Sequence, residues 1–156
     1  VCLAPTQSKL DVLNGYGVDT ILMDRKDPEI HKKAVFERFP YGVDAIVDAT
    51  GSASVLPDCF QLLKKQGRLL QFSSTKDDEN ITINPAYFYR NELQYYTSYC
   101  QVHEFGRAVD AIASGKVRLD KLVTRLYTLE QFPQAIEDVL DHSVLKLVIR
   151  PNGMED

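Results

Sequence analysis

The feature that most constrains this chain is the alternation of short apolar runs with stretches of helical periodicity. The apolar runs cover residues 1–4, 20–23, 45–47 and 69–72. Helical patterns cover residues 8–14 and 27–39, and a third begins near Val55 and is expected to end at Gly67 in the left-handed conformation. Nearly continuous apolar strands that alternate with helices are typical of a parallel sheet covered on both faces. The first half of the sequence therefore predicts an α/β fold.

The rhythm changes after Ser74. A polar stretch over residues 76–80 is expected to form a loop, and residues 93–99 a further strand. Residues 104–114 carry apolar side chains at helical spacing and precede a glycine, which is a common helix stop. Thr128 and Gln131 form a capping-box pattern, and residues 122–124 and 144–149 are expected to be extended.

Composition and charge exclude several classes of protein. A chain of 156 residues is long enough for one domain or for parts of two. The net charge is −4, with acidic and basic residues interspersed, so we expect no nucleic-acid partner. Since no apolar run approaches the roughly 20 residues that cross a bilayer, we also expect no membrane partner.

The cysteines and histidines have no spacing typical of a disulfide framework or a metal site. The cysteines are odd in number and widely separated, and we interpret them as buried thiols in a reducing compartment, which predicts a cytoplasmic location. We expect the isolated histidines to be surface or packing residues. These residues are Cys2, Cys59, Cys100, His31, His103 and His142.

Small and hydroxylated residues follow several of the expected strands, at residues 5–9, 49–52, 73–74 and 97–99. A parallel α/β sheet binds nucleotides in the crevice at the carboxyl ends of its strands. These segments are therefore candidate contacts of a nucleotide, although strand ends are commonly polar in proteins without one.

The sequence resembles the medium-chain, zinc-dependent dehydrogenases in five segments: "GVDAIVDATGS", "LLKKQGRLLQFSST", "INPAYFYRNELQYYTSYCQ", "ASGKVRLDKLVTRLYTLEQFPQAIEDV" and "LKLVIRP". Within that family it is most similar to the sorbitol, xylitol and arabinitol dehydrogenases. The resemblance covers nearly the whole chain but only about the last two fifths of a typical member. It implies a partial Rossmann-like, dinucleotide-binding domain over residues 1–102. Residues 103–156 would be the C-terminal segment of a GroES-like catalytic domain.

The same resemblance implies that the first strand, the glycine-rich turn and the zinc ligands lie upstream of Val1. No catalytic residue and no metal ligand is therefore expected in this chain, which we interpret as a fragment that is inactive alone. The strand over residues 1–4 would then be the second strand of the cofactor domain.

An acidic residue at the end of that second strand would select NAD, because it hydrogen-bonds the adenosine ribose. Ala4 occupies this position and cannot make that bond. Thr6, Ser8 and Lys9 could instead hold a 2′-phosphate, through hydroxyl hydrogen bonds and the positive charge of the ammonium group. The alternative is purely structural, with Thr6 as a helix N-cap and Lys9 solvated. We favour NADP over NAD as the cofactor.

The resemblance also implies roles for three further segments. Residues Thr50, Gly51 and Ser52 would lie near the diphosphate and ribose; Phe72, Ser73 and Ser74 would lie beside the nicotinamide ribose; and Thr97, Ser98 and Tyr99 would lie near the carboxamide. Two structural alternatives remain, a helix cap for Ser52 and core packing for Tyr99. Sorbitol dehydrogenase-like members often have an arginine at the position of Ser98, which leaves a role for Ser98 toward the substrate hydroxyl in doubt.

The implied activity is hydride transfer between a polyol or secondary alcohol and NADP(H) or NAD(H), assisted by zinc in the full-length enzyme. Two alternatives remain open: a non-catalytic Rossmann-like binding or interaction domain, and a zinc-free quinone reductase-like member. Members of the resembled family are commonly dimers or tetramers that pair through the sheet edge near residues 93–99, so we expect a homo-oligomer of the full-length protein, although that aromatic-rich strand is also compatible with plain packing.

Overall fold

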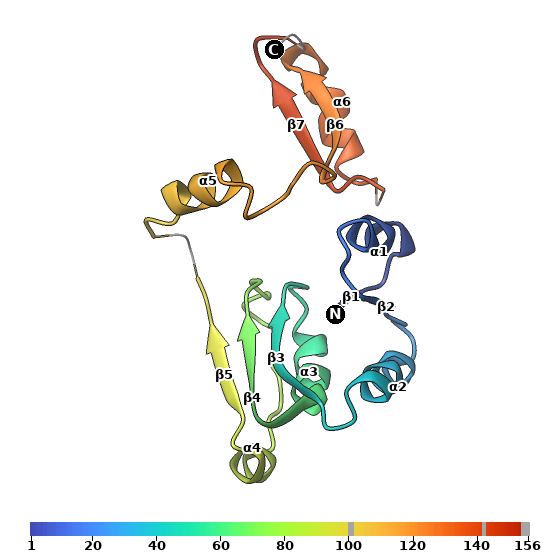
Figure 1. Ribbon diagram of the computed structural model, residues 1–156, viewed down its shortest axis with the longest axis vertical. Helices are drawn as coiled ribbons and strands as arrows, with labels where there is room; N and C mark the ends of the chain where they lie inside the picture. The colour runs from blue at the N-terminus through green and yellow to red at the C-terminus, as the bar shows by residue number, and fades with distance from the viewer. Residues whose placement is uncertain (100–101, 142, 154–156) are drawn as a thin grey trace. The chain divides into compact units, whose positions relative to one another are not determined.

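The apolar runs form parallel strands in a computed structural model, which describes residues 1–99, 102–141 and 143–153. In chain order the elements are β1 (Cys2–Ala4), α1 (Gln7–Asn14), β2 (Thr20–Leu22), α2 (Pro28–Arg38), β3 (Val43–Asp48), η1 (Ala53–Val55), α3 (Leu56–Leu62), β4 (Leu63–Gln71), α4 (Pro85–Asn91), β5 (Gln94–Thr97), α5 (Phe105–Ala113), β6 (Val123–Thr128), η2 (Leu129–Gln131), α6 (Phe132–Asp138) and β7 (Lys146–Arg150). The predicted α/β fold is confirmed (Figure 1). None of the described helices is long and apolar enough to span a membrane.

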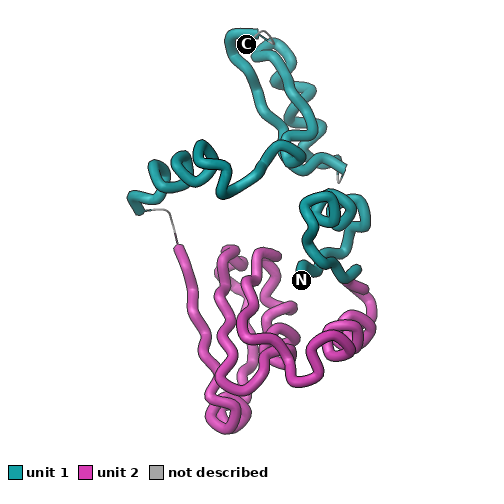
Figure 2. Tube along the Cα trace, in the orientation of Figure 1, with its two compact units in different colours: residues 1–22, 102–156 teal, residues 23–101 magenta. Residues whose placement is uncertain are grey.

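The chain divides into two compact units, which Figure 2 colours separately. One unit comprises residues 23–101, and the other joins residues 1–22 to residues 102–156. The predicted boundary between a dinucleotide-binding part over residues 1–102 and a C-terminal part over residues 103–156 stays a prediction.

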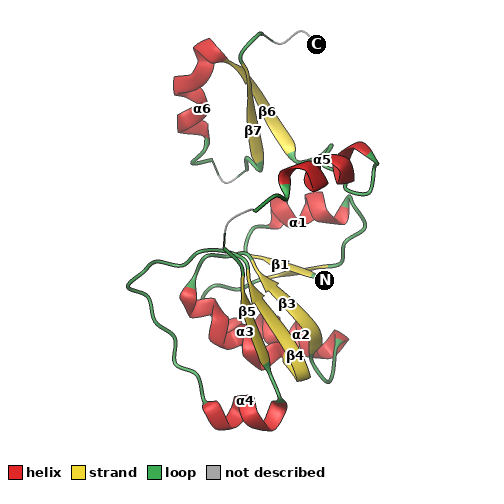
Figure 3. Cartoon of the chain, turned by 90° about the vertical axis from the view of Figure 1, so that its left-hand side faces the viewer, coloured by secondary structure: helices red, strands yellow, loops and turns green. Residues whose placement is uncertain are grey.

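The unit of residues 23–101 is built on the parallel sheet β3-β4-β5 (Figure 3). Its core joins α3 to β4 through buried side chains, of which Leu69 is fully buried. The Phe60 ring lies edge-on to Phe88 and Tyr95, with centroids 4.7 and 5.3 Å away. These rings bring α4 and β5 onto the same core, because aromatic pairs favour such edge-to-face contacts.

Helix α2 is tied to α3 by the buried Lys32. Its ammonium nitrogen lies 2.6 Å from Asp58 and 2.8 Å from Glu29, and it donates to Gln61 at 3.0 Å. Burial alone would lower the pKa of Lys32, but the hydrogen bonds to Asp58 and Glu29 raise it above its ordinary value. The lysine is therefore held in its charged form, and burying it is compensated by these partners.

In the other unit, β1 and β2 pair in parallel with each other. Helix α1 connects them in the chain, and its Leu10 is buried. The turn after α1 contacts residues 118–121. The Tyr16 hydroxyl accepts a hydrogen bond from the Lys121 backbone N–H at 2.7 Å, and the Lys121 ammonium donates to the Gly15 carbonyl at 2.7 Å. The side-chain charges of Arg118 and Lys121 lie over the Tyr16 ring, at 5.7 and 5.2 Å from its centre.

The strands β6 and β7 also pair in parallel, and α6 connects them. Arg125 on β6 forms ion pairs with Asp138 at 2.6 Å and Asp141 at 2.7 Å. The capping box predicted from Thr128 and Gln131 is confirmed, since the Gln131 side chain accepts from the Thr128 N–H at 2.9 Å.

One expectation about the unit of residues 23–101 is wrong, and one helix in it was not expected. Gly67 does not end the third helix, because α3 ends at Leu62 and residues 63–71 already belong to β4. The residue with left-handed backbone is Gln66, at φ 62°. The aromatic-rich segment after Asn84 contains a helix, α4, that we did not expect, although Asn84 caps it through Ala86 and Tyr87 and Pro85 opens it.

The turn before β3 requires a glycine. Gly42 has φ +86°, and an added Cβ would lie 2.7 Å from both the Leu62 carbonyl oxygen and the Lys64 nitrogen. We expect Gly42→Ala to lower the free energy of unfolding by about 1–3 kcal/mol from backbone strain alone, with the backbone clash adding to this.

Urea unfolding of the naturally encoded protein measures this effect. Gly106→Ala is the control, because Gly106 lies in α5 with open space around its Cβ position, and alanine there is expected to stabilise by up to about 1 kcal/mol. Equal effects of the two substitutions would contradict the steric argument.

Candidate functional site

The carboxyl ends of three strands meet at one edge of the sheet in residues 23–101. The register pairs Asp48, the last residue of β3, with Gln71 on β4, and Gln71 with Thr97 on β5. The three arrowheads accordingly point to the same end of the sheet in Figure 1. The segments that follow these strands therefore begin side by side, as the parallel arrangement predicts.

A pocket lies at this edge. Its lining residues come from the ends of β4 and β5 and from the loop after β4: Gln71, Phe72, Ser73, Ser74, Thr75, Lys76, Asp77, Glu79, Thr97, Ser98 and Tyr99. Six of the residues predicted from the sequence are among them: Phe72, Ser73, Ser74, Thr97, Ser98 and Tyr99. Tyr99 is 87% exposed, so in this structure it is not a core-packing residue.

The turn after β3 is organised by the Asp48 carboxylate. Its Oδ1 accepts from the Thr50 backbone N–H at 3.1 Å and from the Thr50 hydroxyl at 2.7 Å. The same hydroxyl accepts from the Ser52 N–H at 3.2 Å. Ser52 stands before the helical turn η1, but its side chain makes no cap hydrogen bond and instead pairs with the Ser54 hydroxyl at 2.8 Å.

Gly51 brings this turn close to the loop after β4. It has φ +70°, and an added Cβ would lie 3.0 Å from the Ser74 carbonyl oxygen and 3.7 Å from the Ser73 Cβ. Any larger residue would therefore be strained and would crowd Ser74. The small residues on both sides leave the edge open to a flat, polar ligand, which fits a dinucleotide.

Thr6, Ser8 and Lys9 lie in the other unit, at the start of α1. Thr6 occupies the N-cap position, and its carbonyl accepts from the Lys9 N–H at 3.2 Å, but its side chain makes no cap hydrogen bond. The Thr6 and Lys9 side chains are half-buried, and Ser8 is exposed.

The sequence reasoning missed the polar residues next to the predicted ones. Asp48 and Gln71 are the last residues of their strands, and Glu79 accepts from the Ala53 N–H at 3.4 Å. Only the local part of the Asp48 arrangement has a sequence signal, since an aspartate side chain commonly accepts from the backbone N–H two residues further on, whereas its bonds to residues 72 and 73 have none. The pocket-lining Lys76, Asp77 and Glu79 carry no such signal, because a polar loop is the ordinary interpretation of their sequence.

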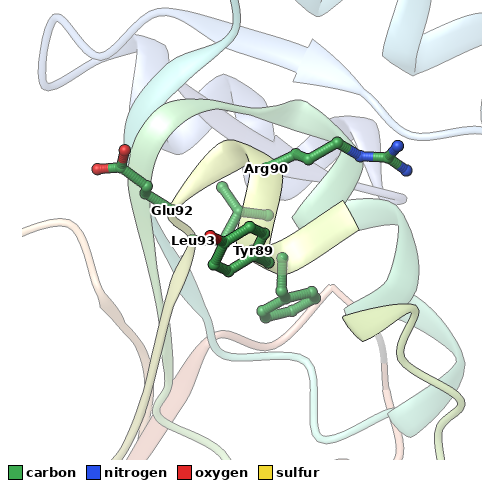
Figure 4. A pocket seen from close by; sticks show the side chains of 5 residues that line it. Tyr89, Arg90, Glu92 and Leu93 are labelled. Carbon is green, nitrogen blue, oxygen red and sulfur yellow. The ribbon is translucent and has the colours of Figure 1, made fainter. Parts of the chain in front are cut away.

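A second pocket lies at the amino-terminal side of β5, between the end of α4 and the start of the strand (Figure 4). The side chains of Arg90 and Glu92 extend in opposite directions there, and Glu92 accepts from the Gln66 side chain at 2.9 Å. None of the predicted site residues lines it. It is therefore separate from the edge where the strands end.

The described residues contain no group of three or more His, Cys, Asp or Glu side chains that could hold a metal ion. Cys59 and His31 are buried, and Cys2 is half-buried. Cys100 and His142 lie outside the described residues. No step of zinc chemistry is therefore assigned to a described side chain.

Comparison with known proteins identifies the family. Residues 1–114 match the family model described as zinc-binding dehydrogenase. The chain belongs to this family. Its relatives include D-arabinitol dehydrogenase 1 of Uromyces fabae, which is 32% identical over 130 residues, or 83% of this chain and 37% of the relative. The predicted resemblance is confirmed.

Solved structures of zinc-binding dehydrogenases and related enzymes share the fold. A Sinorhizobium meliloti structure described as a zinc-binding dehydrogenase bound to NADP matches with a TM-score of 0.82 and 20% identity, covering 96% of this chain and 44% of that one. An Escherichia coli alcohol dehydrogenase complexed with NADH matches with a TM-score of 0.81 and 19% identity, covering 94% and 43%. The chain thus spans about two fifths of the length of these dehydrogenases.

Cys59, in the core between α3 and β4, has a thiol of low reactivity. Burial, together with the negative charges of Asp48 and Asp58, raises the pKa of Cys59 to about 12. The thiol is therefore protonated throughout the range in which proteins are handled, and only a thiolate reacts readily with alkylating agents.

We expect iodoacetamide at pH 8 to label Cys59 at least tenfold more slowly than Cys2, which is half-buried. Mass spectrometry of the labelled peptides measures both rates in one sample. In urea the difference should disappear, because unfolding removes the burial. Equal rates in the folded protein would show that Cys59 is accessible and would contradict this description.

Proposed function

We propose that this chain is the dinucleotide-binding part of an oxidoreductase. The enzyme transfers a hydride between a polyol or secondary alcohol and NADP(H) or NAD(H), with zinc assisting in the complete protein. The observation that carries the proposal is the convergence of Phe72 to Ser74 and Thr97 to Tyr99 on one pocket at the carboxyl end of a parallel sheet. Family membership and the name of the arabinitol-oxidising relative support it.

The residues at this edge have binding and orienting roles. Ser73, Thr97 and Ser98 present hydroxyls that can donate to or accept from the ribose and carboxamide of the cofactor, whereas the Ser74 hydroxyl donates to the Thr75 carbonyl at 3.1 Å and can only accept. Phe72 is 61% exposed at the same edge and offers an apolar surface for the flat nicotinamide ring. When bound, the nicotinamide exchanges a hydride at its C4, and the protein supplies its orientation.

Further features of the complete protein are part of the proposal. We place it in the cytoplasm, since the sequence suggests free thiols in a reducing compartment. We also propose a homo-oligomer that pairs through β5, whose Tyr96 side chain is half exposed.

Hydride transfer by the naturally encoded protein tests the proposal directly. Absorbance at 340 nm, measured with a panel of polyols and secondary alcohols and with either cofactor, should rise as the reduced nicotinamide forms. Gly51→Ala should raise KM for the cofactor about tenfold, since the added methyl group crowds the Ser74 carbonyl at 3.0 Å. A protein that binds a dinucleotide but oxidises no alcohol would support the non-catalytic alternative. A protein that reduces quinones instead would support the quinone reductase-like one.

The cofactor preference tests the role of residues 4–9. We expect a higher kcat/KM with NADP than with NAD, because Ala4 provides no carboxylate to repel a 2′-phosphate and Lys9 provides a positive charge. Lys9→Ala should raise KM for NADP about tenfold and leave KM for NAD within about twofold.

The control is Lys33→Ala, which removes an exposed lysine of α2 and should change neither constant. A tenfold or greater preference for NAD in the unmodified protein would contradict the proposed role of Lys9.

A further inference from the structure

Asp48 is a buried carboxylate at the carboxyl end of β3, on the strand-end edge. The residue is 3% exposed, and its Oδ2 is buried without a hydrogen-bond partner among the described residues. Leaving a buried carboxylate oxygen unpaired costs stability, so such a group calls for a reason beyond packing.

Asp48 holds two segments of the edge at once. Through its side chain it binds the Thr50 N–H at 3.1 Å and the Thr50 hydroxyl at 2.7 Å. Through its backbone carbonyl it accepts from the N–H groups of Phe72 at 2.8 Å and Ser73 at 3.3 Å. The turn over residues 49–52 and the loop over residues 72–74 are therefore fixed relative to each other by a single residue.

The bonds of Asp48 also determine what Thr50 can do. A threonine hydroxyl has one proton, and here it is donated to Asp48, while the oxygen accepts from the Ser52 N–H at 3.2 Å. The side chain of Thr50 is thus occupied by the protein and cannot donate to a ligand in this arrangement. Thr50 instead holds the turn that contains Gly51. In this turn an added Cβ on Gly51 would lie 3.0 Å from the Ser74 carbonyl oxygen.

The type of acceptor at position 48 determines how firmly the turn is held. Hydrogen bonds to an ionised carboxylate are stronger than those to a neutral acceptor. Asparagine would keep an acceptor oxygen but lose the charge, and alanine would lose both Thr50 bonds. The three side chains therefore form a graded series in how firmly the turn is held.

We propose that Asp48 is a positioning residue for dinucleotide binding, acting through Thr50 and the 49–52 turn on the shape of the edge formed with residues 72–74. This inference rests on the proposed function. Asp48 itself stays covered and does not touch the ligand. Its effect is on how well the edge is preformed before the cofactor arrives.

The test compares variants of the naturally encoded protein by calorimetric Kd for NADP and NAD and by steady-state kinetics. Asp48→Ala should weaken dinucleotide binding by about 10- to 100-fold, with a smaller change in kcat. Asp48→Asn should fall between Asp48→Ala and the unmodified protein. Asp44→Ala is the matched control: it removes an exposed aspartate of the same strand, paired with Lys64, and should leave the Kd within about twofold.

Thr50→Val removes the hydroxyl that joins Asp48 to the Ser52 N–H but keeps the backbone N–H bond to Asp48, so it tests the side-chain connection and replaces Asp48→Ala if that variant does not fold. It should weaken binding in the same direction. Because both residues act through one set of bonds, the double variant should bind no more weakly than Asp48→Ala alone. If the losses of dinucleotide affinity in the two single variants add up in the double variant, the proposal that Asp48 acts through Thr50 is wrong.

Amide hydrogen exchange in the ligand-free protein provides a readout independent of activity. Thr50 and Ser52 amides should exchange faster in Asp48→Ala and remain unchanged in Asp44→Ala. If Asp48→Ala lowers the melting temperature but keeps the dinucleotide Kd of the unmodified protein, the role is only structural and the inference is wrong while the proposed function stands. If the unmodified protein binds neither dinucleotide, the proposed function fails and the inference with it.

Discussion

The parallel pairing of β4 on both of its sides determines the rest of the unit at residues 23–101. This strand lies between β3 and β5, and its Leu69 is fully buried against α3. Full burial of one leucine side chain stabilises a fold by roughly 1.5–3 kcal/mol, so the sheet and its helix hold each other in place. Because both neighbours run parallel to β4, all three strands must end at the same edge. The position of the candidate site follows from that constraint.

The pairing continues a little beyond the strands and orders the loops at this edge. The Phe72 N–H donates to the Asp48 carbonyl at 2.8 Å, and the Ser98 N–H donates to the Gln71 carbonyl at 3.1 Å. The first residues of each loop are thus fixed by the neighbouring strand rather than by the loop's own sequence. A rigid sheet that carries polar loops at one edge is a common way to position a binding site.

Much of this could be predicted from the sequence, because the signals were periodic or local. Apolar runs and short extended segments located each described strand, although β4 begins at Leu63, inside the stretch expected to be helical, and the capping pair Thr128 and Gln131 is visible from spacing alone. The end of α3 was missed because Gly67 resembles a helix stop, whereas the chain enters β4 at Leu63 and turns at Gln66. Asp48 was missed as an organising residue because its importance arises from two hydrogen-bonded segments that are distant in sequence. Propensity and periodicity carry no information about such contacts.

The polar groups that line the pocket at this edge suit some parts of the proposed dinucleotide better than others. Phosphate binding commonly uses unpaired backbone N–H groups. Here the N–H groups of Phe72, Ser73 and Ser98 already donate to carbonyls of neighbouring strands. The pocket lining offers side-chain hydroxyls, the carboxylates of Asp77 and Glu79, and the ammonium group of Lys76, so it can pair with hydroxyl and amide groups and with a negative charge. If a dinucleotide binds here as proposed, the hydroxyls suit its nicotinamide ribose and carboxamide, and a phosphate group at this edge would depend on Lys76 rather than on the N–H groups of residues 72, 73 and 98.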